Sequence, residues 1–164
     1  MADESLLLLA REVRGKTLRL LDGVADDAAR FAPSGLNNTA LWHAGHALVV
    51  VEHLSVVPAT GGPAGYPPLW FDTFSWKSSP AAVTSWPQLS EVVAALREQL
   101  PRLLEAIAPL SSQQLDQIVD PQRSRTLRYS ILHGLHDEAG HQGEIWLLRK
   151  LHGRQAAAAT SAGS

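Results

Sequence analysis

Apolar residues recur at helical spacing in four long segments of the chain. The first segment runs from about Glu4 to Leu21, and Gly23 ends it. The second segment runs from about Thr39 to Val57, with Asn38 as a candidate N-cap and Pro58 as the residue that ends the helix. On the first segment we expect an apolar face of Leu6, Leu9, Val13, Leu18 and Leu20, with Arg11, Arg14 and Lys16 largely elsewhere.

A long connection, residues 59–86, follows the second segment and is rich in glycine and proline. It is too long for a simple turn between two bundle helices. A solvated linker would not need its many aromatic side chains, so we expect the connection to fold back over one end of the bundle, where it can act as a lid. These aromatic residues are Tyr66, Trp70, Phe71, Phe74, Trp76 and Trp86.

The third helical segment begins near Ser85 or Pro87 and runs to about Ile107. Pro101 lies inside it. Because proline removes a backbone hydrogen bond and clashes with the preceding turn, we expect a kink there or a break near Leu100.

The fourth helical segment runs from about Thr126 to about His152. The remaining tail, 154–164, is rich in small residues, and we expect it to be disordered. No internal repeat and no strand-like alternation of useful length is evident. The pattern therefore predicts an all-α fold, a four-helix bundle with an aromatic-rich connection between its second and third helices, in a single domain over residues 1–153.

Composition and charge exclude several kinds of site and partner. The chain has 164 residues, of which 45% are apolar and 18% charged, as in ordinary globular proteins. It has no cysteine, which excludes disulfides, thiolate metal ligands and cysteine nucleophiles. The formal net charge is −2 and no basic stripe is present, so we expect no nucleic-acid partner. We find no signal-like segment and no apolar run of membrane-spanning length, and therefore expect a cytoplasmic protein without a membrane partner.

Six of the seven histidines fall into two clusters, one in the second helical segment and one in the fourth. In the fourth, His133, Asp137 and His141 are spaced four residues apart, so they lie one turn above another on one helix face. Glu144 extends this polar face, and His46 lies in the middle of a face of the second helix. Polar groups turned inward are costly unless they are paired or bound, and two side chains at this spacing can converge on one ion.

The histidine pattern also has a less specific interpretation than a metal site. A single histidine in a helix is usually a surface residue or a hydrogen-bonded core residue. The rival account of this pattern is a buried hydrogen-bond network of His133, Asp137 and His46 without an ion. The joint pattern of two clusters with a carboxylate at the right spacing favours a divalent metal site.

Two segments of the sequence are similar to a known family. The segment Leu132 to Leu148, LHGLHDEAGHQGEIWLL, resembles the last helix of the DinB/YfiT-like superfamily. The segment Asn38 to Ala47, NTALWHAGHA, resembles the second helix of that family. The resemblance extends over most of the chain, including the aromatic connection, and the His-Gln-Gly-Glu sequence is its most specific part.

The resemblance implies a four-helix bundle, often dimeric, that holds a divalent metal, nickel or zinc, with three histidines. The first ligand then matches His46 and the third matches His141, whereas the remaining family histidine falls on Asp137. A carboxylate can bind the same metals through oxygen. The resemblance thus implies His46, Asp137 and His141 as the metal ligands, with His133 as an alternative one turn earlier.

The resemblance also implies an activity. Some relatives are thiol-dependent transferases or isomerases, in which the metal activates a low-molecular-weight thiol. We therefore expect a homodimeric, metal-dependent enzyme with a small-molecule substrate, in which Glu144 or His133 acts as a base or supports the ligands. Two alternatives remain open: a non-catalytic binding or scaffold protein with a degenerate metal site, and a metal-dependent hydrolase.

Overall fold

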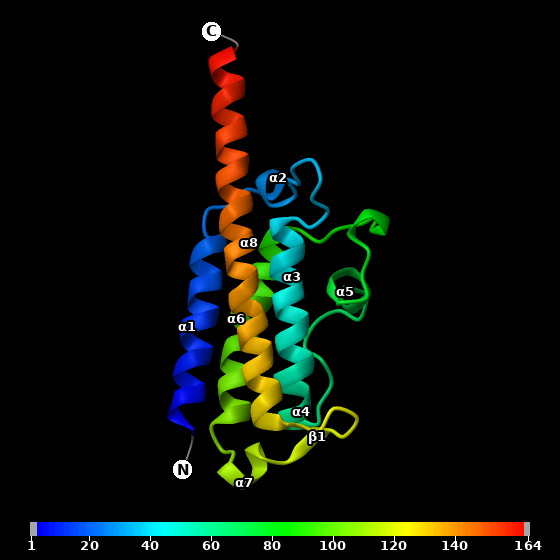
Figure 1. Cartoon of the computed structure of the whole chain (residues 1–164), viewed down its shortest axis with the longest axis vertical. Coiled ribbons are helices and arrows are strands. Elements are labelled where there is room, and N and C mark those ends of the chain that lie inside the picture. Colours follow the sequence, from blue (N-terminus) through cyan, green and yellow to red (C-terminus); the bar gives the residue numbers. More distant parts are fainter. Residues whose placement is uncertain (1–2, 163–164) are drawn as a thin grey trace.

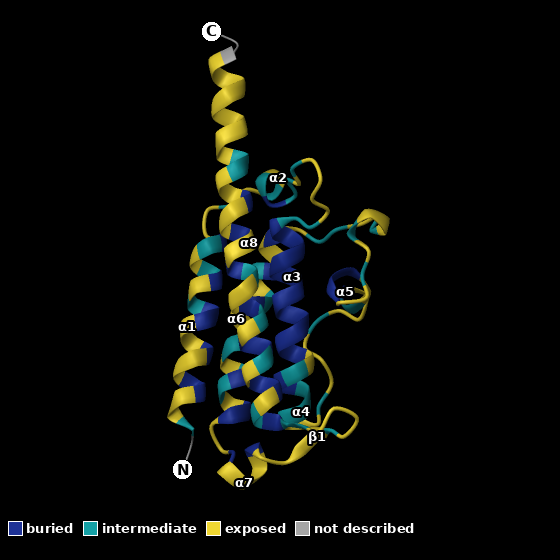
Figure 2. Ribbon diagram, in the orientation of Figure 1, coloured by how far each residue is buried: buried dark blue, intermediate teal, exposed yellow. Residues whose placement is uncertain are grey.

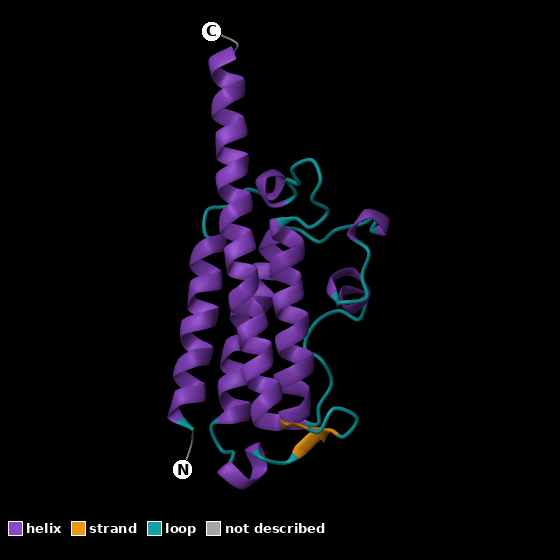
Figure 3. Ribbon diagram, viewed as in Figure 1, coloured by secondary structure: helices purple, strands orange, loops and turns teal. Residues whose placement is uncertain are grey.

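The computed structural model describes residues 3–162 and is mostly helical, which confirms the all-α class (Figure 3). The long helices are α1 (Glu4–Leu21), α3 (Ala40–Val51), α6 (Leu89–Ile107) and α8 (Leu127–Ala162). The short helical elements are α2 (Asp26–Ala29), the π-helical segment η1 (Glu52–Val56), α4 (Val57–Thr60), α5 (Leu69–Phe74), the 3₁₀ segment η2 (Pro80–Ala82) and α7 (Ser112–Leu115). The strands β1 (Ile118–Asp120) and β2 (Arg125–Thr126) form a small antiparallel hairpin that the sequence pattern did not predict.

The helices α1, α3, α6 and α8 lie side by side, and each packs against two of the others (Figure 1). Every residue of α3 is buried (Figure 2). Contrary to the sequence expectation, the helical stretch Ala40–Thr60 is long and apolar enough to cross a membrane, but 83% of its most apolar window is buried inside the protein. The position of α3 between α6 and α8 therefore accounts for its apolar composition.

Three helix boundaries differ from those expected. Thr39, not Asn38, caps α3, because its side-chain oxygen accepts the hydrogen bond of the Trp42 N–H at 3.1 Å. Pro58 does not end the second helical segment, since it lies in the first turn of α4, where a missing N–H is tolerated. Pro101 does not break α6, which continues to Ile107 and buries apolar side chains on both sides of the proline.

The C-terminal end of the last helix also differs from the expectation. α8 does not stop near His152 but continues to Ala162, so residues 154–162 of the expected tail are helical rather than disordered, and residues 163–164 lie outside the described part of the chain. Four consecutive alanines, at 156–159, account for this, because alanine has the highest helix propensity of all residues. The side chains of residues 155–161 are exposed.

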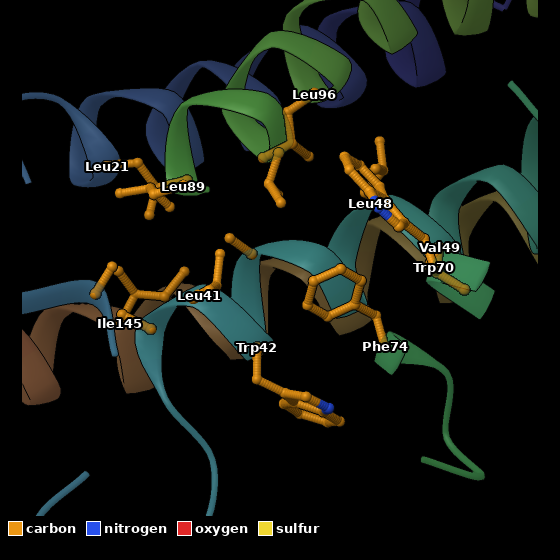
Figure 4. Packing of buried hydrophobic residues seen from close by; sticks show 14 of the residues in the cluster. Leu21, Leu41, Trp42, Leu48, Val49, Trp70, Phe74, Leu89, Leu96 and Ile145 are labelled. Carbon is orange, nitrogen blue, oxygen red and sulfur yellow. The ribbon is translucent and has the colours of Figure 1, made fainter. Parts of the chain in front are cut away.

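Two apolar clusters form the core between the long helices. In the first, Leu41 and Leu48 from α3 pack with Leu89 and Leu96 from α6 (Figure 4). The second lies toward the end of the molecule that carries α7. Its large, almost fully buried members include Leu103, Ile107, Leu115, Ile131 and Leu135. Both clusters include residues of α3, α6 or α8, so the core fixes the positions of these helices relative to one another.

A buried ion pair links α1 to α8. Its arginine, Arg14, was expected to lie away from the apolar face of the first helix. Arg14 is 1% exposed and donates two hydrogen bonds to Glu138, at 2.8 and 2.9 Å. Its remaining donors reach the Leu96 carbonyl and the Gln99 side chain, both on α6. Leu9, expected in the core, is instead 37% exposed. A buried pair with all its partners in place tolerates burial, but loss of one partner is costly.

The connection 59–86 lies beside α3 rather than over an end of the helices (Figure 1). Its helix α5 buries the Phe74 ring against the backbone of α3. Gly45 makes this contact possible, because a Cβ at this position would lie 2.3–2.5 Å from ring atoms of Phe74. The Trp42 indole N–H donates to Ser78 Oγ at 2.9 Å and ties the next part of the connection to the same helix.

Candidate metal centre

Three of the residues singled out in the sequence come together between α3 and α8. His46 comes from α3, and Asp137 and His141 come from adjacent turns of α8. One ligand atom from each residue lies within 4.8 Å of the other two. Asp137 Oδ2 is 3.5 Å from His46 Nε2 and 3.3 Å from His141 Nε2. The sequence spacing and the packing of α3 on α8 thus bring two imidazoles and one carboxylate to one point.

The spacing of these atoms suits a small divalent cation. Ligand atoms that lie about 2.0–2.2 Å from a tetrahedral ion are about 3.3–3.6 Å from one another. Both distances from Asp137 Oδ2 to imidazole nitrogens fall in this range. Asp137 Oδ2 is buried and accepts no hydrogen bond from the described residues. Because a buried carboxylate oxygen without a partner is unfavourable, a bound cation is its natural complement.

The His46 ring is held in one orientation by the connection. Its Nδ1 lies 2.6 Å from the Phe74 carbonyl, which can only accept, so Nδ1 carries the proton and Nε2 is left free toward Asp137. The Trp42 ring stacks on the His46 ring with 4.6 Å between the two centroids. The close contact of Phe74 with Gly45 therefore helps to set the tautomer of a candidate ligand.

The His141 ring is oriented by a second histidine that the sequence reasoning did not include in the site. Nδ1 of His141 lies 2.7 Å from Nδ1 of His43, which is 6% exposed. One of the two nitrogens must carry the proton. If His141 offers Nε2 to a metal, its proton lies on Nδ1 and is donated to His43. His43 then fixes the ring of a ligand without touching the ion.

The electrostatics of the group favour metal binding at neutral pH. Burial lowers the pKa of His46, and the hydrogen bond to Phe74 only partly opposes this. Burial by itself would raise the pKa of Asp137, but the neighbouring His141, His46 and His133 lower it below its usual range. Burial, followed by repulsion from His141 and His46, lowers the pKa of His43 to about 3. A neutral His46 and an ionised Asp137 are the forms that bind a metal ion.

A cavity of about 660 Å³ adjoins two of the three residues, His46 and Asp137. His46 and Asp137 line one part of it, and His133 lines it one turn further along α8. His133 is half-buried and stacks on Tyr129 with 5.8 Å between ring centroids. It does not belong to the group of three, so it borders the site rather than replacing Asp137 as a ligand.

Glu144, the other candidate for a catalytic role, is not brought to this site. It is exposed on α8 and belongs neither to the three-residue group nor to the cavity lining. Gln142, by contrast, is buried and donates to the Val13 carbonyl and to Thr17 Oγ1 on α1. The buried face of α8 is therefore turned further toward α1 than the sequence pattern indicated. Asp137 and His141 lie at the edge of this buried face.

Several residues that shape the site gave only weak signals in the sequence. His43 was part of the histidine cluster, but nothing in its spacing indicated contact with a residue 98 positions away. The Phe74 carbonyl is a backbone group in an irregular segment, which no side-chain pattern reports. Trp42 was visible as an apolar residue between Leu41 and His43, and its contact with His46 follows from their spacing of four.

Comparison with known proteins agrees with this geometry. The sequence model of the DinB superfamily matches residues 9–145, a span that contains His43, His46, Asp137 and His141. No curated protein matches the chain. The match covers most of the sequence and runs from α1 into α8. The chain therefore belongs to the DinB superfamily.

Proposed function

We propose that this protein is a divalent-metal-dependent enzyme of the DinB type, in which His46, Asp137 and His141 hold the ion. The observation that carries the proposal is the approach of one ligand atom from each residue to within 4.8 Å of the others, around a buried carboxylate oxygen whose near neighbours are the two imidazole nitrogens. Nickel and zinc both accept imidazole nitrogen and carboxylate oxygen. Three protein ligands leave a coordination position for substrate, as catalytic sites require.

The proposal includes the finer form of the fold. The four long helices would be the four-helix bundle of the family, and the aromatic connection would support the His46 side of the site through the Phe74 carbonyl. In this arrangement α8 supplies two ligands from adjacent turns and α3 supplies the third. The geometry of the three ligands then depends on how α3 packs against α8.

The chemistry we propose is activation of a low-molecular-weight thiol for transfer or isomerisation. When bound, the ion supplies Lewis acidity that lowers the pKa of a thiol or a water. The protein residues hold neutral imidazoles and an ionised carboxylate in place, and His133 lies in the cavity where it can accept the proton of the thiol. Val50, Leu54 and Trp76 line the same cavity and limit the access of water. Thiol chemistry is favoured over hydrolysis because some members of the superfamily that these segments resemble are thiol-dependent enzymes.

Metal analysis of protein purified without a histidine tag tests the proposal. We expect about one Ni²⁺ or Zn²⁺ per chain in the wild type, and loss of the ion in His141→Ala and Asp137→Ala. His136→Ala is the matched control, because His136 is exposed on the same helix and lies outside the group. A wild-type protein that takes up neither ion after incubation would overturn the proposal and favour a scaffold with a degenerate site.

A parallel screen of thiol-conjugation and ester or amide hydrolysis substrates separates the two chemistries. We expect turnover that requires both the ion and an added thiol. Turnover that requires the ion but no thiol would identify a metal-dependent hydrolase instead.

A further inference from the structure

The β1–β2 hairpin lines the cavity beside the His46–Asp137–His141 group, and the proposed function assigns it no role. Residues 119–123 and Arg125 of the hairpin line the same cavity as His46 and Asp137. The strand pairing places Asp120 across from Arg125, and Ser124 in the turn adopts a left-handed conformation with φ of 52°. The hairpin thus presents two arginines, Arg123 and Arg125, to the same cavity as the candidate ligands.

The two arginines differ in what they bind within the protein. Arg123 donates to Asp120 Oδ2 at 3.1 Å, and this pair lowers the pKa of Asp120. Arg125 lies with its guanidinium carbon 5.1 Å from the centre of the Tyr129 ring. Its side chain has no hydrogen bond or ion pair with any of the residues that the structure describes, although Asp120 is near enough to interact electrostatically. Its five N–H donors are therefore available to a ligand.

The charges around the cavity favour an anionic ligand. The lining contains two aspartates, of which Asp120 is already paired with Arg123 and Asp137 belongs to the metal group. With a divalent cation in place, the cation and Arg125 leave the cavity with a surplus of positive charge. A half-buried guanidinium held over an aromatic ring is well suited to bind a carboxylate through two parallel hydrogen bonds.

The remaining walls of the cavity define the body of the ligand. They combine apolar side chains with polar ones such as His53, Gln122 and Ser130, and they come from α3, η1, α4, the hairpin, α8 and the connection after α5. Their apolar members are Val50, Leu54, Val57, Pro58, Trp76 and Val119. A volume of about 660 Å³ lies within the range of small-molecule sites. The lining therefore fits a short apolar chain or ring that carries one acidic group.

We propose that this cavity binds a small carboxylate-bearing molecule, with its carboxylate on Arg125 and its other end at the His46–Asp137–His141 group. This inference rests on the proposed function for the role of the metal end, but the Arg125 end can be tested with or without an ion. The hairpin then acts as the element that selects an acidic substrate or thiol, while α3 and α8 position its reacting end.

Titration calorimetry with matched ligands tests the assignment. The probes are mercaptoalkanoic acids of graded chain length and the corresponding amides, titrated into zinc-loaded protein, and the sulfur-free alkanoic acids titrated into metal-free protein. We expect the best-fitting acid to bind at least about 10-fold more tightly than its amide, a difference of about 1.4 kcal/mol. Arg125→Met should remove this preference and leave amide binding unchanged.

The double variant Asp120→Asn/Arg123→Met is the matched control, because it removes the other arginine of the hairpin together with its partner and leaves no unpaired carboxylate beside Arg125. We expect less than about a 3-fold change in acid binding for this variant, against about 10-fold or more for Arg125→Met. Unchanged circular dichroism and thermal unfolding in both variants would exclude loss of the hairpin. Equal binding of acid and amide, or equal losses in the two variants, would overturn the proposal. An acid preference in protein that binds no metal would support this inference while refuting the metal-dependent function.

Discussion

At the scale of single residues, the pair His43 and His141 determines whether α8 presents its candidate ligand in the tautomer that leaves Nε2 free for a metal. Replacing His43 with phenylalanine keeps a ring in the core but removes the acceptor 2.7 Å from His141 Nδ1. We expect metal affinity to fall about 10- to 100-fold, as it does when other outer partners of metal-binding histidines are removed. Competition with a chelator of known affinity measures the loss.

The control for this prediction is His43→Asn. An asparagine side-chain oxygen reaches about as far as Nδ1 and can accept the same hydrogen bond. We therefore expect His43→Asn to retain most of the affinity that His43→Phe loses. Equal losses in both variants would show that packing of the ring, rather than the hydrogen bond to His141, supports the ligand.

The low pKa of His43 also predicts how the metal-free protein responds to acid. The pKa is lowered from 6.5 to about 3 in the folded state. Between these values the unfolded chain binds a proton at this position that the folded chain does not. The free energy of unfolding therefore decreases as the pH falls, by up to about 1.4 kcal/mol per pH unit from this group.

Denaturant titrations of the apoprotein between pH 7 and pH 4.5 measure this dependence. In His43→Asn the proton-binding group is absent, so the unfolding free energy should change less steeply over the same range. An identical pH dependence in the variant and the wild type would contradict a buried, neutral His43.

At the scale of elements, the contact of α5 with α3 depends on a single missing side chain. In Gly45→Ala the new methyl group would lie 2.3–2.5 Å from the Phe74 ring, so the ring and its backbone must shift. We expect a loss of about 1–3 kcal/mol in the free energy of unfolding, typical of overpacking. The same shift should weaken metal binding, because the Phe74 carbonyl orients His46.

Gly140→Ala is the matched control on α8. A Cβ at this exposed position meets no described atom within 4 Å. Alanine should therefore stabilise the helix by about 0.5–1 kcal/mol. Urea unfolding of both variants compares the two effects, and equal stability of Gly45→Ala and Gly140→Ala would refute the close approach of Phe74 to α3.

The same elements show how far the sequence could predict the structure. The long helices follow from apolar periodicity, and the ladder of Asp137 and His141 follows from a spacing of four. Arg14 was misplaced because periodicity treats every charged residue as solvent-facing, whereas its partners Glu138 and Gln99 come from distant helices. A buried network of this kind depends on tertiary contacts that local spacing does not contain.

The connection and the hairpin could not be predicted for a different reason. Residues 59–86 have no period, so the sequence indicated that their aromatic residues are buried but not against which helix. The strands are only three and two residues long, too short for an alternating pattern to be recognised. These segments contribute the Phe74 carbonyl, which contacts His46, and Arg125, which lines the cavity beside it.

At the scale of the whole molecule, the site draws on segments that are far apart in the sequence. α3 supplies His46, α8 supplies Asp137 and His141, and the connection supplies the carbonyl that orients His46. The site is therefore complete only when these segments are packed together. A bound ion that recognises only the folded arrangement must in turn raise the stability of the whole bundle. The homodimer and the cytoplasmic location expected from the sequence remain predictions.

The end of α8 marks a boundary of the cooperatively folded molecule. The helix projects beyond the neighbouring helices (Figure 1), and the side chains of residues 155–161 are exposed. A helix end without tertiary packing is only marginally stable, so removing residues 155–164 should change the free energy of unfolding by less than about 0.5 kcal/mol. Metal affinity should also be unchanged, while helical circular dichroism falls and rapidly exchanging amides are lost. A truncated protein that is destabilised by more than about 1 kcal/mol would show that this segment packs against another surface. If that loss depended on protein concentration, the surface would belong to a second copy of the chain, as expected for a homodimer.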